Sequence, residues 1–154
     1  SKTGKARIKL DSSWESGVIE EEARNPDFVC WIRNKKAEKW ALCIPYEINN
    51  ETRATYPDFL VIRKDEKTGY VVDILEPHNP NFTDNLPKAK GFAKYAEQET
   101  KIGRFQLIRK TKDGGVDKYV RLDFSKGEIR KKVLAMQTTE ELNHLFDTDG
   151  VFEN

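Results

Sequence analysis

The chain has 154 residues, of which 27 are basic and 26 acidic, so its formal net charge is +1 at pH 7. This balance excludes a protein that binds polyanions through its overall charge, although it is compatible with a local basic groove. The length suits a single domain, which we expect to cover residues 1–154. No apolar run approaches the roughly 18 residues of a membrane span, and there is no signal-peptide pattern. We therefore expect a cytoplasmic protein without a membrane partner and, because the chain starts at Ser1 and not at Met, a domain excised from a longer polypeptide.

The first third of the chain predicts a helix followed by short strands. A serine cap at Ser12 or Ser13 precedes apolar residues at helical spacing, and Asn25-Pro26 ends this pattern. Residues 1–11 are basic and partly alternating, which suits either a tail or an edge strand. Further along we expect a strand over 29–33, a charged turn over 34–39, a returning strand over 40–44 and a polar connection over 45–55.

The two cysteines lie within apolar runs and lack the spacing of metal ligands. Cys30 belongs to the first expected strand and Cys43 to the second. Free cysteine is among the most buried residue types, so both are predicted to be reduced core residues, with a disulfide as the alternative.

The central part of the chain predicts a β-hairpin with an acidic residue at the open end of each strand. The runs 56–62 and 70–75 are short, apolar and β-branched, and a charged loop joins them. Asp58 and Glu76 lie equally far along the chain from Lys67, near the middle of that loop. In an antiparallel pair with this register the two carboxylates face each other. Because like charges at such a distance repel, a proton or a cation is expected between them, and a divalent metal is the natural occupant.

The remainder of the chain completes an α/β pattern. Alanines and phenylalanine recur at helical spacing after Pro87, which the first turn of a helix tolerates. Thr138 and Glu141 fit a capping box at the start of the last helix. The expected fold is α/β, with a central mixed sheet of about four to five strands flanked by helices. The elements expected here are helices over 84–100, 128–136 and 139–146, and strands over 105–108 and 116–124.

The Pro57-Asp58 pair at the start of one strand and Glu76 at the end of the next resemble the PD-(D/E)xK nuclease superfamily. The order of elements agrees with the helix, three strands, helix and strand of its restriction-endonuclease-like core. Within the superfamily the chain is most similar to nuclease domains attached to type III restriction and helicase subunits. The similar segments are Trp14-Glu15, Val29 to Asn34, Ile44 to Tyr46, Tyr56 to Phe59, Ile74 to His78, and Asp84 followed by Lys88 to Ala93.

This resemblance implies hydrolysis of DNA phosphodiester bonds with Mg²⁺ or Mn²⁺ as cofactor. Asp58 and Glu76 would hold the metal together with the carbonyl oxygen of Pro77, since hard divalent cations prefer oxygen ligands. Many members of the superfamily add an acid from the first helix; Glu15 is the candidate here and Glu22 the alternative. The run 20–22 that contains Glu22 also fits a solvated helix face.

The chain departs from the superfamily pattern at the position of the catalytic lysine. Two residues after Glu76 the sequence has His78, which could act when protonated or serve as a base near neutral pH. Alternatively, the lysine has migrated to the following helix as Lys88 or Lys90. Lys90 is slightly preferred, because it flanks the apolar stripe of that helix. A third alternative is a site that binds DNA and no longer cuts it.

Contacts with nucleic acid are expected to be mainly electrostatic. The preferred phosphate-binding candidates are Arg33, Lys36, Arg53 and Lys94, and Lys35 and Lys101 are further ones. A fused or associated helicase module is the expected partner besides DNA. A catalytically inactive DNA-binding module and a scaffold that makes only protein contacts are the competing hypotheses.

Overall fold

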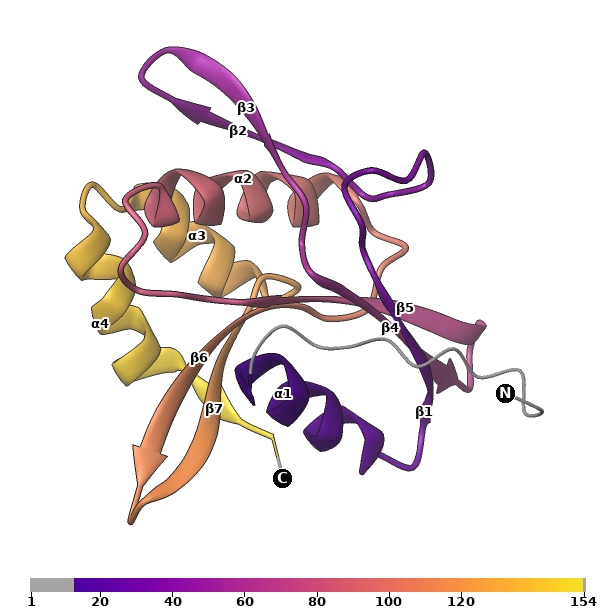
Figure 1. Ribbon diagram of the computed structural model, residues 1–154. Coiled ribbons are helices and arrows are strands. Elements are labelled where there is room, and N and C mark those ends of the chain that lie inside the picture. The colour runs from indigo at the N-terminus through magenta and orange to yellow at the C-terminus, as the bar shows by residue number, and fades with distance from the viewer. Residues whose placement is uncertain (1–12, 154) are drawn as a thin grey trace.

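The computed structural model describes residues 13–153, so the expectation for residues 1–11 lies outside the described part of the chain. The described residues form an α/β fold with four helices, a mixed sheet and a separate hairpin (Figure 1). The helices are α1 (Ser13–Ala23), α2 (Asn85–Gln98), α3 (Gly127–Ala135) and α4 (Thr139–Asp149). The strands are β1 (Phe28–Arg33), β2 (Ile44–Ile48), β3 (Glu51–Thr55), β4 (Phe59–Asp65), β5 (Gly69–Pro77), β6 (Phe105–Asp113), β7 (Val116–Asp123) and β8 (Val151–Phe152).

The main sheet has six strands in the order β1-β4-β5-β6-β7-β8. Strands β1, β4 and β5 are antiparallel, whereas β5 and β6 are parallel and are connected through α2. Strands β6, β7 and β8 are again antiparallel. The predicted mixed sheet is thus confirmed, with six strands where four to five were expected. Strand β8 has only two residues, and it pairs with β7, which is distant from it in the sequence. No local sequence pattern therefore predicts this strand.

Helices cover both faces of the sheet (Figure 1). On one face, Val18 and Ile19 of α1 pack against Phe59, Val61 and Leu75. On the other face, α2, α3 and α4 contribute to a larger apolar core. That core includes Ile74, Ala89, Phe92, Phe105, Leu122, Val133 and Phe146. Each strand of the β4–β5 hairpin therefore has one side chain set beneath α1 and the alternate set facing α2.

The segment 40–55 differs from the expected strand and polar connection. Residues 40–43 are not a strand, and a two-stranded hairpin, β2–β3, occupies the segment after them. Asn49 and Asn50 form its turn with φ angles of 52° and 61°, the left-handed conformation that tight hairpin turns require and that asparagine tolerates. The hairpin depends on packing, because Ile44 and Tyr46 of β2 are buried while four of the five residues of β3 are exposed.

The burial of three side chains also differs from the prediction. Cys30 and Cys43 are free and exposed, so the expected core positions for the cysteines were wrong. Glu22 is only 3% exposed, although Glu20 on the same helix is exposed as a solvated face would be. The reason is the rotation of α1, which directs position 22 onto the sheet and leaves position 20 outside.

An ion-pair network surrounds Glu22 beneath α1. Its carboxylate accepts hydrogen bonds from Arg104 at 2.6 Å and from Arg121. Arg104 also donates to Asp73 at 2.8 Å, and Arg63 pairs with the same carboxylate. The carboxylates of Glu22 and Asp73 are therefore both paired with arginine guanidinium groups. A buried carboxylate requires such a partner.

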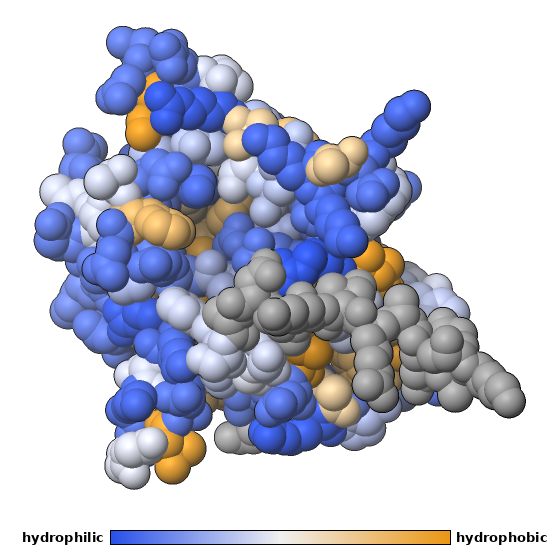
Figure 2. All heavy atoms as spheres, in the orientation of Figure 1, coloured by the Kyte–Doolittle hydropathy of each residue, from blue (hydrophilic) through white to orange (hydrophobic). Residues whose placement is uncertain are grey.

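The face of the molecule seen in Figure 2 is mainly hydrophilic, with isolated apolar side chains between charged ones. None of the helices described in residues 13–153 combines the length and the apolar character needed to cross a membrane.

Candidate active site

Two carboxylates lie opposite each other at the open end of the β4–β5 hairpin. Phe59 pairs with Leu75 in the antiparallel ladder, so the next positions outward, Asp58 and Glu76, oppose each other. This is the register predicted from their equal separation from Lys67. Because Phe59 and Leu75 both point beneath α1, the alternation of a strand directs Asp58 and Glu76 to the face that carries α2.

The pKa of the Glu76 carboxyl is raised well above its ordinary value. Burial of the carboxyl is the main cause, and the negative charge of Asp58 adds to it. Two facing carboxyl groups of like charge favour the uptake of a proton, whose place a cation could take.

A lysine from α2 provides a positive charge beside this pair. The ammonium of Lys88 acts to lower the pKa of Glu76, and it forms an ion pair with Asp84 at 3.3 Å. Tyr46 of β2 donates a hydrogen bond from its hydroxyl to the same oxygen of Asp84 at 3.0 Å. The Lys88 nitrogen also lies 5.9 Å from the centre of the Tyr46 ring. Lys88 is therefore held between the β2–β3 hairpin and the start of α2.

Asp84 is charged in this arrangement. Although partial burial acts to raise it, the pKa of Asp84 lies below its ordinary value because of the Lys88 charge and the hydrogen bond from Tyr46. Neither Tyr46 nor Asp84 was given a role in the sequence analysis. Both lie in segments that resemble the nuclease superfamily, but only the packing of β2 on α2 brings them together.

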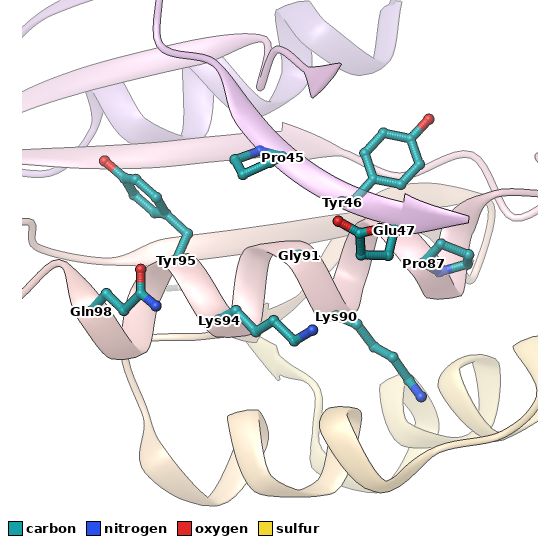
Figure 3. Close-up of a pocket in the computed structure, with 9 residues that line it drawn as sticks. All are labelled: Pro45, Tyr46, Glu47, Pro87, Lys90, Gly91, Lys94, Tyr95 and Gln98. Atoms are coloured by element: carbon teal, nitrogen blue, oxygen red, sulfur yellow. The ribbon is translucent and has the colours of Figure 1, made fainter. Parts of the chain in front are cut away.

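Lys90 and Lys94 lie on a different side of α2 from Lys88. Two residues along a helix correspond to a rotation of about 200°, so Lys88 and Lys90 cannot face the same surface. Both lysines line a groove between α2 and β2, which has a volume of about 280 Å³. In Figure 3 the Lys94 side chain lies along the helix and the end of Lys90 points away from β2. The groove is lined by Pro45, Tyr46, Glu47, Pro87, Lys90, Gly91, Lys94, Tyr95 and Gln98.

His78 is buried and uncharged at neutral pH. Its ring stacks on Phe146 of α4 with 5.1 Å between centroids, and it is 3% exposed. Burial and the nearby Arg109 lower the pKa of His78 to about 4. It lines a cavity of about 70 Å³ together with Glu76 and Lys88. A neutral imidazole brings no positive charge to this end of the hairpin, whereas the Lys88 ammonium does.

Glu15 lies on the α1 face, across the sheet from the carboxylate pair. It forms an ion pair with Arg33 at 3.1 Å, and the Arg33 guanidinium lies 5.2 Å from the centre of the Phe59 ring. Within residues 13–153, no three acidic, histidine or cysteine side chains converge on a point where they could share a metal ion. The structure thus brings Asp58, Glu76 and Lys88 together and places Glu15 elsewhere.

The basic side chains predicted to bind nucleic acid are spread over several elements. Arg33 is half-buried through its pair with Glu15, and Lys36 lies 5.8 Å from the centre of the Tyr56 ring. Arg53 is exposed on β3 and pairs with Glu51 at 3.6 Å. Lys94 is exposed on α2, and the structure places it with Lys90 at the groove.

Comparison with known proteins assigns nearly the whole chain to one protein family. The protein named Protein YagJ from Escherichia coli (strain K12) is 29% identical over 135 residues, which are 86% of this chain and 54% of that protein. The chain therefore spans about half the length of the curated relative that it matches. No solved structure matches the chain. Because the sequence profile of the YagJ family matches residues 1–153, the chain belongs to the YagJ family.

Proposed function

We propose that the chain is a metal-dependent DNA nuclease domain that uses Mg²⁺ or Mn²⁺ to hydrolyse phosphodiester bonds. The observation that carries this proposal is the opposition of Asp58 and Glu76, with the Lys88 charge acting on Glu76. Following the resemblance to nuclease domains attached to helicase subunits, the proposal includes a helicase or other DNA-handling module as a partner, and the cytoplasm as the location.

The order of elements supports a restriction-endonuclease-like core. Helix α1, the antiparallel strands β1, β4 and β5, helix α2 and the parallel strand β6 follow one another in the order of the superfamily that the sequence resembles. The β2–β3 hairpin is an insertion between the first and second strands of this core. The two acids then lie at the start of the second core strand and the end of the third.

The donor atoms of the site suit a hard divalent cation. Burial and the negative charge of Asp58 both raise the pKa of Glu76, and a cation bound by Asp58 and Glu76 would stabilise the charged form of both carboxylates. Mg²⁺ is commonly bound by one or two carboxylates and several waters. When bound, it would supply an activated water and compensate charge on the phosphate.

Lys88 is assigned the part of the motif lysine. Its ammonium is fixed by Asp84 and Tyr46 on the side of Glu76, where it can stabilise negative charge that develops on the phosphate. His78 is assigned no proton transfer, because its ring is packed on Phe146 and enclosed by protein.

Nicking of supercoiled plasmid DNA in Mg²⁺ or Mn²⁺ tests the proposal. The unaltered chain is expected to nick, Asp58→Asn and Glu76→Gln to lose nicking, and Lys88→Met to be strongly impaired. Glu97→Gln is the matched control, because Glu97 is an exposed acid on α2 away from the pair. Unimpaired nicking by either carboxylate variant, or no nicking by the unaltered chain in either metal, would contradict the proposal.

The alternative is a DNA-binding module of the same fold without chemistry. The observation that favours it is the neutral, buried His78 at the position of the motif lysine. This alternative predicts that the chain retards DNA in gel electrophoresis and leaves it intact in every divalent metal.

A further inference from the structure

We infer that the groove between α2 and β2 binds a single strand of nucleic acid. The inference rests on the proposed function for the identity of the ligand. The groove itself is built from residues outside the carboxylate site, and Figure 3 shows how they are arranged around it.

The floor of the groove depends on a close approach between the hairpin and the helix. At Gly91 an added Cβ atom would lie 2.7 Å from the carbonyl oxygen of Pro45 and 2.8 Å from the Cβ of Tyr46. Glycine at this buried position therefore allows β2 to lie directly on α2. The backbone of β2 and the helix α2 together form a rigid wall. Binding sites that exist before the ligand arrives have such walls.

The charge of the groove suits an anionic ligand. Lys90 and Lys94 are four residues apart on one helix side, where two like charges destabilise a helix unless an anion compensates them. None of the ion pairs found within residues 13–153 involves either lysine. The acid of the lining, Glu47, accepts a hydrogen bond from Thr52 of the same hairpin at 2.6 Å. Phosphates of a nucleic-acid backbone would supply the missing negative charge.

The aromatic and proline residues of the groove suit unstacked bases. The Tyr95 ring packs edge-on against Phe105 with 6.0 Å between centroids, so the core holds its orientation. Pro45 of β2 lies on the opposite side of the groove (Figure 3). Proteins that bind single strands combine a basic groove with aromatic rings on which bases stack, and bases within a duplex are not available for this. These features favour a single strand over a duplex.

Tyr46 connects the groove with the residues beside the candidate active site. This residue lines the groove, and its hydroxyl holds Asp84, the ion-pair partner of Lys88. A ligand in the groove would therefore contact the residue that holds Asp84 beside Lys88.

Binding of a fluorescein-labelled oligothymidylate, measured by fluorescence anisotropy in EDTA, tests the inference without any cleavage. The double variant Lys90→Glu/Lys94→Glu should weaken binding. In the neutral variant Lys90→Gln/Lys94→Gln, the slope of log association constant against log salt concentration should become shallower by about 1.4, which is about 0.7 for each lost phosphate contact. The control Lys67→Glu/Lys112→Glu makes the same change of charge at exposed positions in other hairpins and should bind better than the groove variant.

Equal weakening by the groove and control variants would overturn the inference, as would more effective competition by duplex DNA than by single strands. The outcome separates this inference from the proposed function. A chain that binds through the groove and cuts nothing would refute the nuclease and keep the groove. A chain that cuts DNA and binds oligonucleotides equally well with and without Lys90 and Lys94 would refute the groove alone.

Discussion

The hydroxyl of Tyr46 donates a hydrogen bond to Asp84 at 3.0 Å, and this contact connects the β2–β3 hairpin to the N-cap position of α2. The same Asp84 oxygen forms the ion pair with Lys88. The hairpin, which is an insertion in the proposed core, therefore helps to position Lys88, whose charge acts on Glu76.

Replacement of Tyr46 by phenylalanine should slow DNA cleavage through its effect on Lys88. The variant keeps the ring and loses one hydrogen bond, worth about 1 kcal/mol. We expect kcat to fall about fivefold with little change in KM, measured from initial rates of plasmid nicking. Tyr70→Phe is the control, since the Tyr70 side chain is exposed on β5. If Tyr46→Phe slows the Lys88→Met variant as much as it slows the unaltered chain, Tyr46 does not act through Lys88.

The facing carboxylates should make the stability of the chain depend on divalent metal. A metal that binds the folded state at about 100 times its Kd adds about 2.7 kcal/mol to the free energy of unfolding. Thermal unfolding should therefore shift upward with Mn²⁺ in the unaltered chain and in Glu97→Gln. Glu76→Gln should lose this shift, and in EDTA it should be at least as stable as the unaltered chain, because the repulsion by Asp58 is relieved. A full Mn²⁺ shift in Glu76→Gln would exclude this pair as the metal site.

Asp73 should stabilise the fold at neutral pH and lose its effect in acid. Burial acts to raise the pKa of Asp73, but hydrogen bonds from Arg63 and Arg104 outweigh it and bring the pKa below the ordinary 3.8. A lowered folded-state pKa means that the stabilisation is complete above the unfolded value and disappears as the pH falls through the folded value.

Asp73→Asn should accordingly cost about 3 kcal/mol at neutral pH, since it removes one partner of a buried ion pair. Urea unfolding should show the difference between the two chains shrinking below about pH 4. Asp117→Asn is the control, because Asp117 pairs with Lys110 at the surface at 3.2 Å and such pairs contribute about 0 to 1 kcal/mol. A constant difference down to strong acid would show that the Asp73 charge is not the cause.

Gly91→Ala should destabilise the fold although alanine is the better helix former. In an exposed helix the change would add about 1 kcal/mol of stability. Here the new Cβ would lie 2.7 Å from the Pro45 carbonyl oxygen, and overpacking of this kind costs about 1 to 3 kcal/mol. Gly127→Ala is the control, since the nearest atom to its added Cβ is the flexible end of Arg130 at 3.5 Å. Equal or greater stability of Gly91→Ala in urea unfolding would show that β2 moves away freely.

Much of the fold and the facing of Asp58 and Glu76 could be predicted from the sequence because both depend on local patterns. All four helices were expected, α1 and α2 from the spacing of their apolar residues and α4 from its capping box. Thr138 indeed caps α4 by accepting a hydrogen bond from the Glu141 backbone at 3.3 Å. The register of β4 and β5 follows from a short loop between two alternating runs, so equal separation from Lys67 sufficed to place the two acids opposite each other.

What only the tertiary structure decided concerns how the elements are rotated and packed against one another. The angular position of α2 determines that Lys88 and not Lys90 reaches Glu76, and the seating of β2 on that helix brings Tyr46 to Asp84. The rotation of α1 buries Glu22 among arginines that come from distant strands. The sequence by itself thus determined which residues are neighbours along each element and within one hairpin. Contacts between elements depend on the packing of side chains that are far apart in the chain, and no local pattern encodes that packing.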